Sequence, residues 1–303
     1  MDQNAPTKTV NKLNIKINKK DVVKKVFQSL MFIFVFFLLG LLLSYLFPEE
    51  KIISENLRLP LQKKVMASVG DYIIENEQIS KYIGENYQVI DGQNNISWND
   101  LSKNLPNLEP GDIFFTSSGK YLSSLFIPGK WKHSAIYLGS KNQLIKFFGE
   151  ESEIFKNFSF YYKDDKQILV IDSSSDGVQI REIKELSNIS KSSYLKSFVA
   201  FRINKEKEQI INFLNKSKNQ IGKEYDYDLI TENDQELYCS ELIYHSLEEI
   251  GFEIDKEKTY ARETVSPDNL VNYMAKNDDF SFIIFLEKQN GKIKKLPKSY
   301  LIK

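Results

Sequence analysis

Residues 237–251, LYCSELIYHSLEEIG, hold Cys239, the only cysteine of the chain, where an apolar periodicity typical of a helix begins. The unpaired N–H groups and the dipole at a helix amino terminus favour a thiolate over a thiol, which makes a cysteine nucleophilic. A lone cysteine beside apolar residues is equally compatible with a small buried core side chain. The stretch therefore predicts a helix and raises, without deciding, the question of a catalytic thiol. The side chains predicted to face the core are Leu242, Ile243, Leu247 and Ile250.

A nucleophilic thiol needs a base, and the chain has two histidines. His245 lies about 600° around the helix from Cys239, so we interpret it as a surface or packing residue that points away. His133 opens the apolar stretch HSAIYLG (133–139) after a turn, where its ring can reach a neighbouring helix end. Asp172 closes the apolar stretch QILVID (167–172) and can accept a hydrogen bond from an imidazole, although an aspartate there is also a common turn former.

Composition excludes several other kinds of chemistry. The 303 residues include 41 Lys and Arg against 41 Asp and Glu, which gives no argument for a nucleic acid partner. One cysteine rules out an intramolecular disulfide, and one cysteine with two separated histidines makes no metal-ligand spacing. Because no glycine-rich phosphate loop is present either, we expect neither a metal nor another cofactor.

Residues 26–47, VFQSLMFIFVFFLLGLLLSYLF, contain no charged residue. As a helix they would span roughly 33 Å, close to the thickness of a bilayer core. Lysines precede the segment and two glutamates follow Pro48, which predicts a membrane anchor with its amino terminus in the cytoplasm. A cleaved signal peptide would be shorter and end in a small-residue site, and a buried core helix is rarely apolar on every face. We therefore predict a single-pass membrane protein whose remaining residues are extracytoplasmic.

The rest of the chain predicts an α+β domain with a mostly antiparallel sheet. Residues 1–25 are interpreted as a basic cytoplasmic tail, 48–95 as a helical stalk or as packing helices, and 96–303 as the main domain. Residues 149–166 are interpreted as an insertion in a loop, and the end of the chain as a lysine-rich tail. Strands are predicted at 112–117, 133–139, 142–148, 167–172, 177–183, 197–203 and 281–287, and helices at 205–221 and 238–251.

Five pieces occur in an order that resembles a known family: PGDIFFTSSGKYLSSLFIPGKWKHSAIYLG, VIDSSSDGVQIREIKEL, IGKEYDYDL, LYCSELIYHSL and VSPDNL. Over residues 108–272 the sequence is similar to the YiiX-like branch of the permuted papain-fold cysteine hydrolases, within the NlpC-type superfamily. The resemblance implies a permuted papain-like fold, with Cys239 as nucleophile and His133 as base. Asp172 stands where the family usually has glutamate, and a shorter carboxylate can still orient an imidazole.

The resemblance also implies the reaction. An amide, ester or thioester would be cleaved through an acyl-thioenzyme, with Tyr225 and Tyr238 lining the substrate cleft, although core packing is an alternative for Tyr225. Cell-wall peptide is a natural substrate for a tethered extracytoplasmic enzyme. Two other functions stay open: an acyl hydrolase or acyltransferase acting on lipid or lipoprotein, and a non-enzymatic binding module on the same fold.

Overall fold

The computed structural model describes residues 24–25, 28, 30–33, 94–118, 129–191, 193–226, 235–259 and 262–302. The predicted tail (1–25), anchor (26–47) and stalk (48–95) lie almost wholly outside these residues. The few described positions between 24 and 33 are helical, and the side chains at 30–33 are exposed. None of the helices in the described part of the chain is both long enough and apolar enough to cross a membrane.

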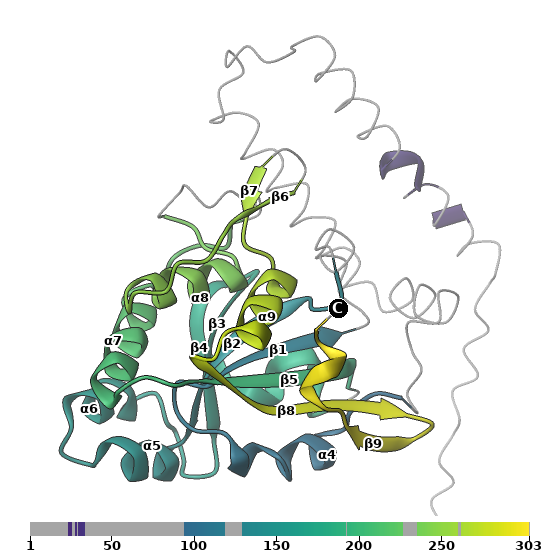
Figure 1. The fold of residues 1–303 in the computed structure, drawn as a ribbon. Helices are drawn as coiled ribbons and strands as arrows, with labels where there is room; N and C mark the ends of the chain where they lie inside the picture. Colours follow the sequence, from purple (N-terminus) through teal and green to yellow (C-terminus); the bar gives the residue numbers. More distant parts are fainter. Residues whose placement is uncertain are drawn as a thin grey trace, which may run out of the picture.

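A seven-stranded antiparallel sheet organises the described domain (Figure 1). Its order is β4-β3-β2-β1-β5-β8-β9, so the strands nearest in sequence are mostly neighbours in the sheet. This confirms the predicted α+β class with an antiparallel sheet. The strands are β1 (Ile113–Ser118), β2 (His133–Ser140), β3 (Ile168–Ser174), β4 (Gly177–Glu182), β5 (Leu195–Ile203), β8 (Phe280–Gln289) and β9 (Lys292–Lys295).

Alternation along the strands divides the interior into two cores, one on each face of the sheet. In β1, Phe115 belongs to one core while Phe114 belongs to the other, where it stacks on Phe198 of β5 with ring centroids 5.0 Å apart. The central strands are buried on both faces, so they read as continuous apolar runs.

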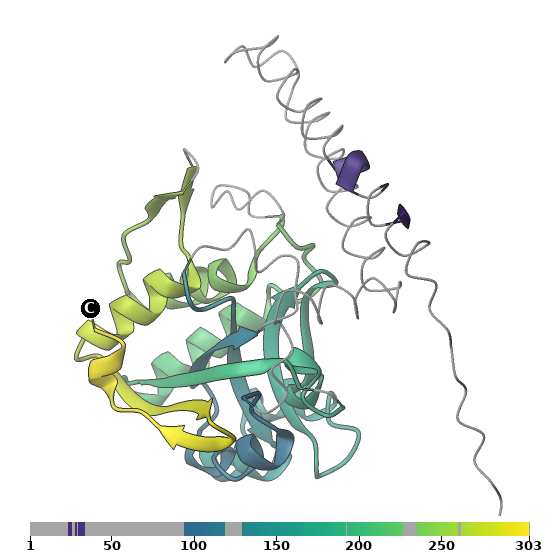
Figure 2. The same cartoon turned by 90° about the vertical axis from the view of Figure 1, so that its right-hand side faces the viewer.

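Helices cover both faces of this sheet. The larger core lies under α5 (Lys141–Phe148), α6 (Glu153–Ser159), α7 (Lys207–Lys218), α8 (Cys239–Glu248) and α9 (Pro267–Lys276). The smaller core lies under α4 (Trp98–Ser102) and the short 3₁₀ helices η1 (Leu105–Asn107) and η3 (Ile183–Asn188). A two-stranded ribbon, β6 (Glu257–Thr259) with β7 (Arg262–Thr264), stands out from the body in both views (Figure 1, Figure 2).

One predicted strand is wrong: residues 142–148 form helix α5. Ser140 caps this helix, because its hydroxyl accepts the N–H of Gln143 while the Gln143 side chain accepts the N–H of Ser140. This reciprocal capping box fixes a helix start that a short apolar run does not reveal. The predicted loop insertion at 149–166 also contains a helix, α6, and buries Ile154 and Phe158 in the larger core.

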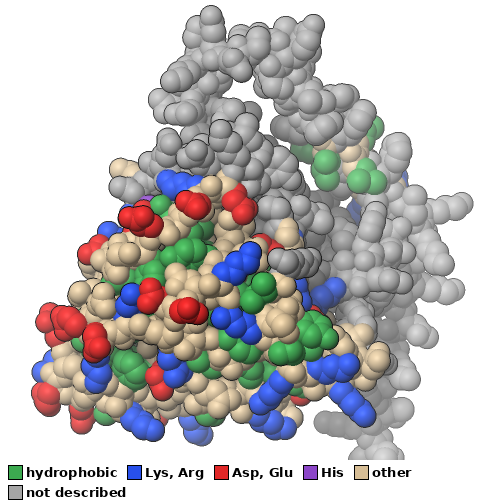
Figure 3. All heavy atoms as spheres, viewed as in Figure 1, with side chains coloured by type: hydrophobic (Ala, Val, Ile, Leu, Met, Phe, Trp, Pro, Cys, Tyr) green, Lys and Arg blue, Asp and Glu red, His purple; other side chains and the backbone are tan. Residues whose placement is uncertain are grey.

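The lysine-rich end of the chain is partly ordered in the sheet, since β9 pairs with β8 as an edge strand. Lys292, Lys294 and Lys295 are exposed there, and Figure 3 shows basic side chains gathering at this corner. Lysines on an edge strand discourage pairing with another sheet, which gives this charge a structural explanation.

Candidate active site

Cys239 is the first residue of α8, as the periodicity predicted, and only 2% of it is exposed. The Glu241 carboxylate accepts the backbone N–H of Tyr238 at 3.3 Å, which stabilises the start of the helix. The apolar face of α8 is buried, and the helix packs on β2 and β3. The thiol is therefore held at the end of a helix fixed against the sheet.

Hydrogen bonds hold the segment before Cys239 between the end of β3 and the segment around residue 224. The Ser173 hydroxyl, at the end of β3, donates to the Leu237 carbonyl at 2.5 Å. The Leu237 N–H donates to the Glu224 carbonyl at 2.9 Å. The neighbouring Lys223 carbonyl accepts the N–H of Val178 in β4, also at 2.9 Å. Gly177 makes that approach possible, because a Cβ there would lie 2.2 Å from the Lys223 carbonyl oxygen. These contacts place the thiol beside the strand ends.

The segment that leads into His133 is clamped by α9. The Asp268 carboxylate accepts the backbone N–H groups of Lys130 (3.1 Å) and Trp131 (2.7 Å). Trp131 is buried and packs edge-on against Phe285 with ring centroids 5.5 Å apart. The start of β2 is thereby fixed in position.

His133 connects the thiol to a carboxylate. Its Nε2 lies 2.7 Å from Oδ2 of Asp172, and the imidazole is close enough to the Cys239 thiol for the two groups to shift each other's pKa. Ser134, the next residue of β2, is fully buried and also lowers the pKa of the thiol. The antiparallel register sets this geometry, since Ala135 pairs with Asp172 and brings the start of β2 to the end of β3. The three residues singled out from the sequence lie together.

The contacts favour a charged thiolate and imidazolium. Burial by itself would lower the pKa of His133, but the hydrogen bond to Asp172 and the contact with Cys239 raise it to about 9. Burial would raise the pKa of Cys239, but His133 and then Ser134 lower it below its usual value. The proton is therefore favoured on the ring and the negative charge on sulfur.

Arg181 of β4 is a further member of the cluster that the sequence did not reveal. It forms an ion pair with Asp172, which has no exposed surface. Burial would raise the pKa of Asp172, but Arg181 and then His133 bring it below the usual value. The alternation of GVQIREI contained the signal, because Arg181 and the Asp172 partner Gln179 point to the same face of β4.

His245 is not part of this cluster, in agreement with the helical geometry. Its Nδ1 lies 2.9 Å from Glu248, and its Nε2 lies 3.7 Å from the buried Glu241. Burial raises the pKa of Glu241 to about 7, with His245 opposing the shift and Asp226 adding to it. The two histidines therefore have different partners: His133 interacts with the thiol, and His245 interacts with carboxylates of its own helix.

The two tyrosines predicted for the substrate cleft have different surroundings. Tyr238 is buried, and its hydroxyl accepts the N–H of Val265 at 3.0 Å, which fixes α8 to the segment before α9. Tyr225 is half-buried near the end of a described segment. A role in the cleft stays a prediction for both.

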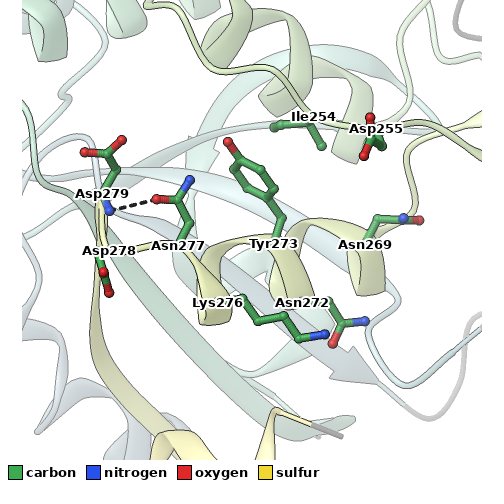
Figure 4. Close-up of a pocket in the computed structure, with 9 residues that line it drawn as sticks. All are labelled: Ile254, Asp255, Asn269, Asn272, Tyr273, Lys276, Asn277, Asp278 and Asp279. Atoms are coloured by element: carbon green, nitrogen blue, oxygen red, sulfur yellow. Dashed lines mark hydrogen bonds between the residues drawn. The ribbon is translucent and has the colours of Figure 1, made fainter.

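A separate hollow of about 690 Å³ lies on another part of the surface, between α9 and the loops beside it (Figure 4). Tyr273 and Asn272 of α9 line it with polar neighbours, and it holds neither the thiol nor the imidazole. Among the residues that the structure describes, no cluster of three His, Cys, Asp or Glu side chains could hold a metal.

Comparison with known families decides the assignment. Residues 107–290 match the model of the permuted papain-like amidase enzymes, YaeF/YiiX, C92 family. The chain belongs to this family. In this chain the strand that begins with His133 precedes the helix that begins with Cys239. The family supports an amide-bond hydrolase and confirms the resemblance seen in the sequence.

A comparison with solved structures found a further similarity. A crystal structure titled metalloprotein yiiX from Escherichia coli O157:H7 aligns with 13% sequence identity and a TM-score of 0.36. The alignment covers 63% of this chain and 97% of that one. No curated protein matches the sequence.

Proposed function

We propose that this protein is a cysteine amidase that cleaves amide bonds through an acyl-enzyme on Cys239. The observation that carries the proposal is the placement of His133, whose ring bonds the Asp172 carboxylate and interacts electrostatically with the buried Cys239 thiol. A cysteine kept only for packing has no need of a basic ring with a carboxylate behind it.

The chemistry takes two steps. The Cys239 thiolate attacks the amide carbon, and the N–H groups at the start of α8 bind the oxyanion that forms. The His133 imidazolium gives its proton to the leaving nitrogen, the C–N bond breaks, and an acyl-thioenzyme remains. His133, now neutral, takes a proton from water, the hydroxide attacks the thioester, and the acid leaves while sulfur is released as the thiolate. Asp172 orients the ring and stabilises its charge throughout.

We further propose that residues 26–47 anchor the enzyme in a membrane and that the domain works outside the cytoplasm on wall peptide. The support is sequence alone: an uncharged apolar segment with lysines before it and glutamates after it. Retention in the membrane fraction after an alkaline carbonate wash, with the domain open to added protease in spheroplasts, is the expected result. A domain protected from protease would reverse the orientation.

The central test is the mass of the adduct on Cys239. The full chain is incubated with purified wall peptides or with phospholipid vesicles, quenched in acid and analysed by mass spectrometry. We expect a peptidyl adduct that disappears in Cys239→Ala and is lost or much reduced in His133→Ala. His245→Ala is the matched control and keeps the adduct, because that ring does not contact the thiol.

The other outcomes identify the competing functions. A fatty acyl adduct would replace the peptide substrate by lipid and keep the nucleophile. Absence of any adduct, with wall binding equal in wild type and Cys239→Ala, would make the protein a binding module and overturn the proposal.

A further inference from the structure

Asp172 binds two cations through one oxygen. Nε of Arg181 lies 3.1 Å from its Oδ2, and Nη2 of Arg181 bonds the same atom. Nε2 of His133 lies 2.7 Å from that oxygen as well. The other oxygen, Oδ1, is buried and has no hydrogen-bond partner. The carboxylate is thus committed to these two partners.

The register of the sheet produces this arrangement. Asp172 pairs with Gln179 across β3 and β4, and Arg181 is the diagonal neighbour on the same face. A guanidinium stays charged at every relevant pH, whereas an imidazole does not. Arg181 is therefore the permanent cation beside a carboxylate that has no access to water.

Four charges of alternating sign follow one another across three strands and a helix. They are the Cys239 thiolate, the His133 imidazolium, the Asp172 carboxylate and the Arg181 guanidinium. The acidic side chains of α8 interact with His245 instead, since Glu241 lies 3.7 Å and Glu248 2.9 Å from its ring nitrogens. Because Asp172 bonds both Arg181 and His133, removal of Arg181 should change the charge on His133 and, through it, on the Cys239 thiol.

We propose that Arg181 is a positioning residue for the thiol: by keeping Asp172 ionised, it keeps the mobile proton on His133 rather than on the carboxylate. Without Arg181, the buried carboxylate competes with the ring for that proton. A protonated Asp172 leaves His133 neutral, and the thiol then retains its own proton. The inference rests on the proposed function, since it explains how the nucleophile of that reaction is prepared.

The test uses the rate of Cys239 alkylation by iodoacetamide as a function of pH. Cys239 is the only cysteine, so the full chain reports on this thiol alone. We expect Arg181→Met to move the thiol titration upward by at least about one pH unit, which slows alkylation near pH 6 about tenfold. Arg181→Lys, which keeps a cation, should restore much of the rate.

The matched control is Arg202→Met, which removes an arginine from another buried aspartate, Asp112, without touching the array. It should leave the titration of the thiol unchanged. Near-UV circular dichroism verifies folding, and if Arg181→Met does not fold it is replaced by Arg181→Gln, which loses the charge but can still donate a hydrogen bond to Asp172. Arg181→Gln should also show the raised titration, and an unchanged titration in the folded variant would overturn the role of Arg181.

The possible failures are separable. A wild-type thiol that titrates like free cysteine would overturn the proposed function itself. A low wild-type titration that is unchanged in folded Arg181→Met, or moved equally by Arg202→Met, would overturn the role of Arg181 alone. Neither result depends on knowing the substrate.

Discussion

Two buried aspartates, in or next to the two strands that flank β2, each bind an arginine. Asp172 ends the apolar run of β3 and pairs with Arg181, while Asp112 precedes β1 and pairs with Arg202 of β5. Their side chains are 0% and 1% exposed. By burial and by partner type the two sites are nearly the same, yet their carboxylates differ in charge preference.

The difference lies in the number of charges of each sign. At Asp112, one arginine is shared between two carboxylates, because Arg202 also lies 3.1 Å from Glu109. Burial therefore prevails over Arg202 and raises the pKa of Asp112 to about 6. Asp172, by contrast, is a single carboxylate between two cations, Arg181 and His133. Its pKa lies below the usual value despite complete burial. The ratio of cations to carboxylates, rather than depth, separates a structural pair from one that can support catalysis.

The largest expected difference between the two sites is in catalytic activity, and it is tested by replacing each aspartate with asparagine. Asp172→Asn should lower kcat/KM by roughly 10²- to 10⁴-fold, because a neutral amide lacks the negative charge that stabilises the imidazolium. Asp112→Asn should stay within about threefold of wild type, because it contacts no reacting group. The measurement is hydrolysis of the substrate identified from the Cys239 adduct. Equal losses in the two variants would show that both pairs act through stability alone.

A second comparison concerns stability and its dependence on pH. Arg202→Met should lower the free energy of unfolding by about 3–5 kcal/mol near neutral pH, because it leaves a buried carboxylate unpaired. The pKa of Asp112 is raised to about 6, so its protonated form favours the folded state. The stability that it contributes is complete below pH 4 and is lost as the pH rises through 6.

Urea unfolding at several pH values checks this expectation. The loss in Arg202→Met should be smaller at acid pH, where Asp112 is protonated, and should grow as the pH rises. Lys156→Met, which removes an exposed ion pair with Glu151, is the control and should change little. A loss in Arg202→Met that does not change with pH would contradict the raised pKa.

The smallest effect is a shift in the alkaline limit of the reaction. The pKa of His133 is raised to about 9, so the imidazolium that protonates the leaving group is present below that pH and lost above it. Asp172→Asn removes the largest contribution to the raised pKa, and the alkaline limb of its residual activity should move downward by about one to two pH units. Asp112→Asn should leave the limb in place. An unmoved limb in Asp172→Asn would mean that another group sets it.

Much of this site follows from the sequence because each residue marks the end of an element. A helix start identifies Cys239, a strand start His133 and the end of an apolar run Asp172, two residues before β3 itself ends, and antiparallel pairing brings these positions together. The family resemblance supplied their roles. Arg181 did not follow, because it lies inside a strand and its partner depends on a diagonal across the sheet register.

The errors in the fold have a similar origin. Residues 142–148 are apolar enough for a strand, and only the mutual hydrogen bonds of Ser140 and Gln143 decide for a helix. The edge strand β9 was hidden because lysines rather than apolar residues dominate it. Local composition describes solvent exposure well, but a capping partner or a neighbouring strand is a property of the folded chain.

The order of the elements has a consequence for synthesis of the protein. His133, Asp172 and Arg181 all come from β2, β3 and β4, whereas the thiol arrives much later, on α8. A chain emerging from the ribosome can pair those strands before Cys239 has been made. The Cys239 thiol would then become reactive only when α8 packs against those strands. A chain in which α8 has not yet packed exposes an ordinary, weakly reactive cysteine.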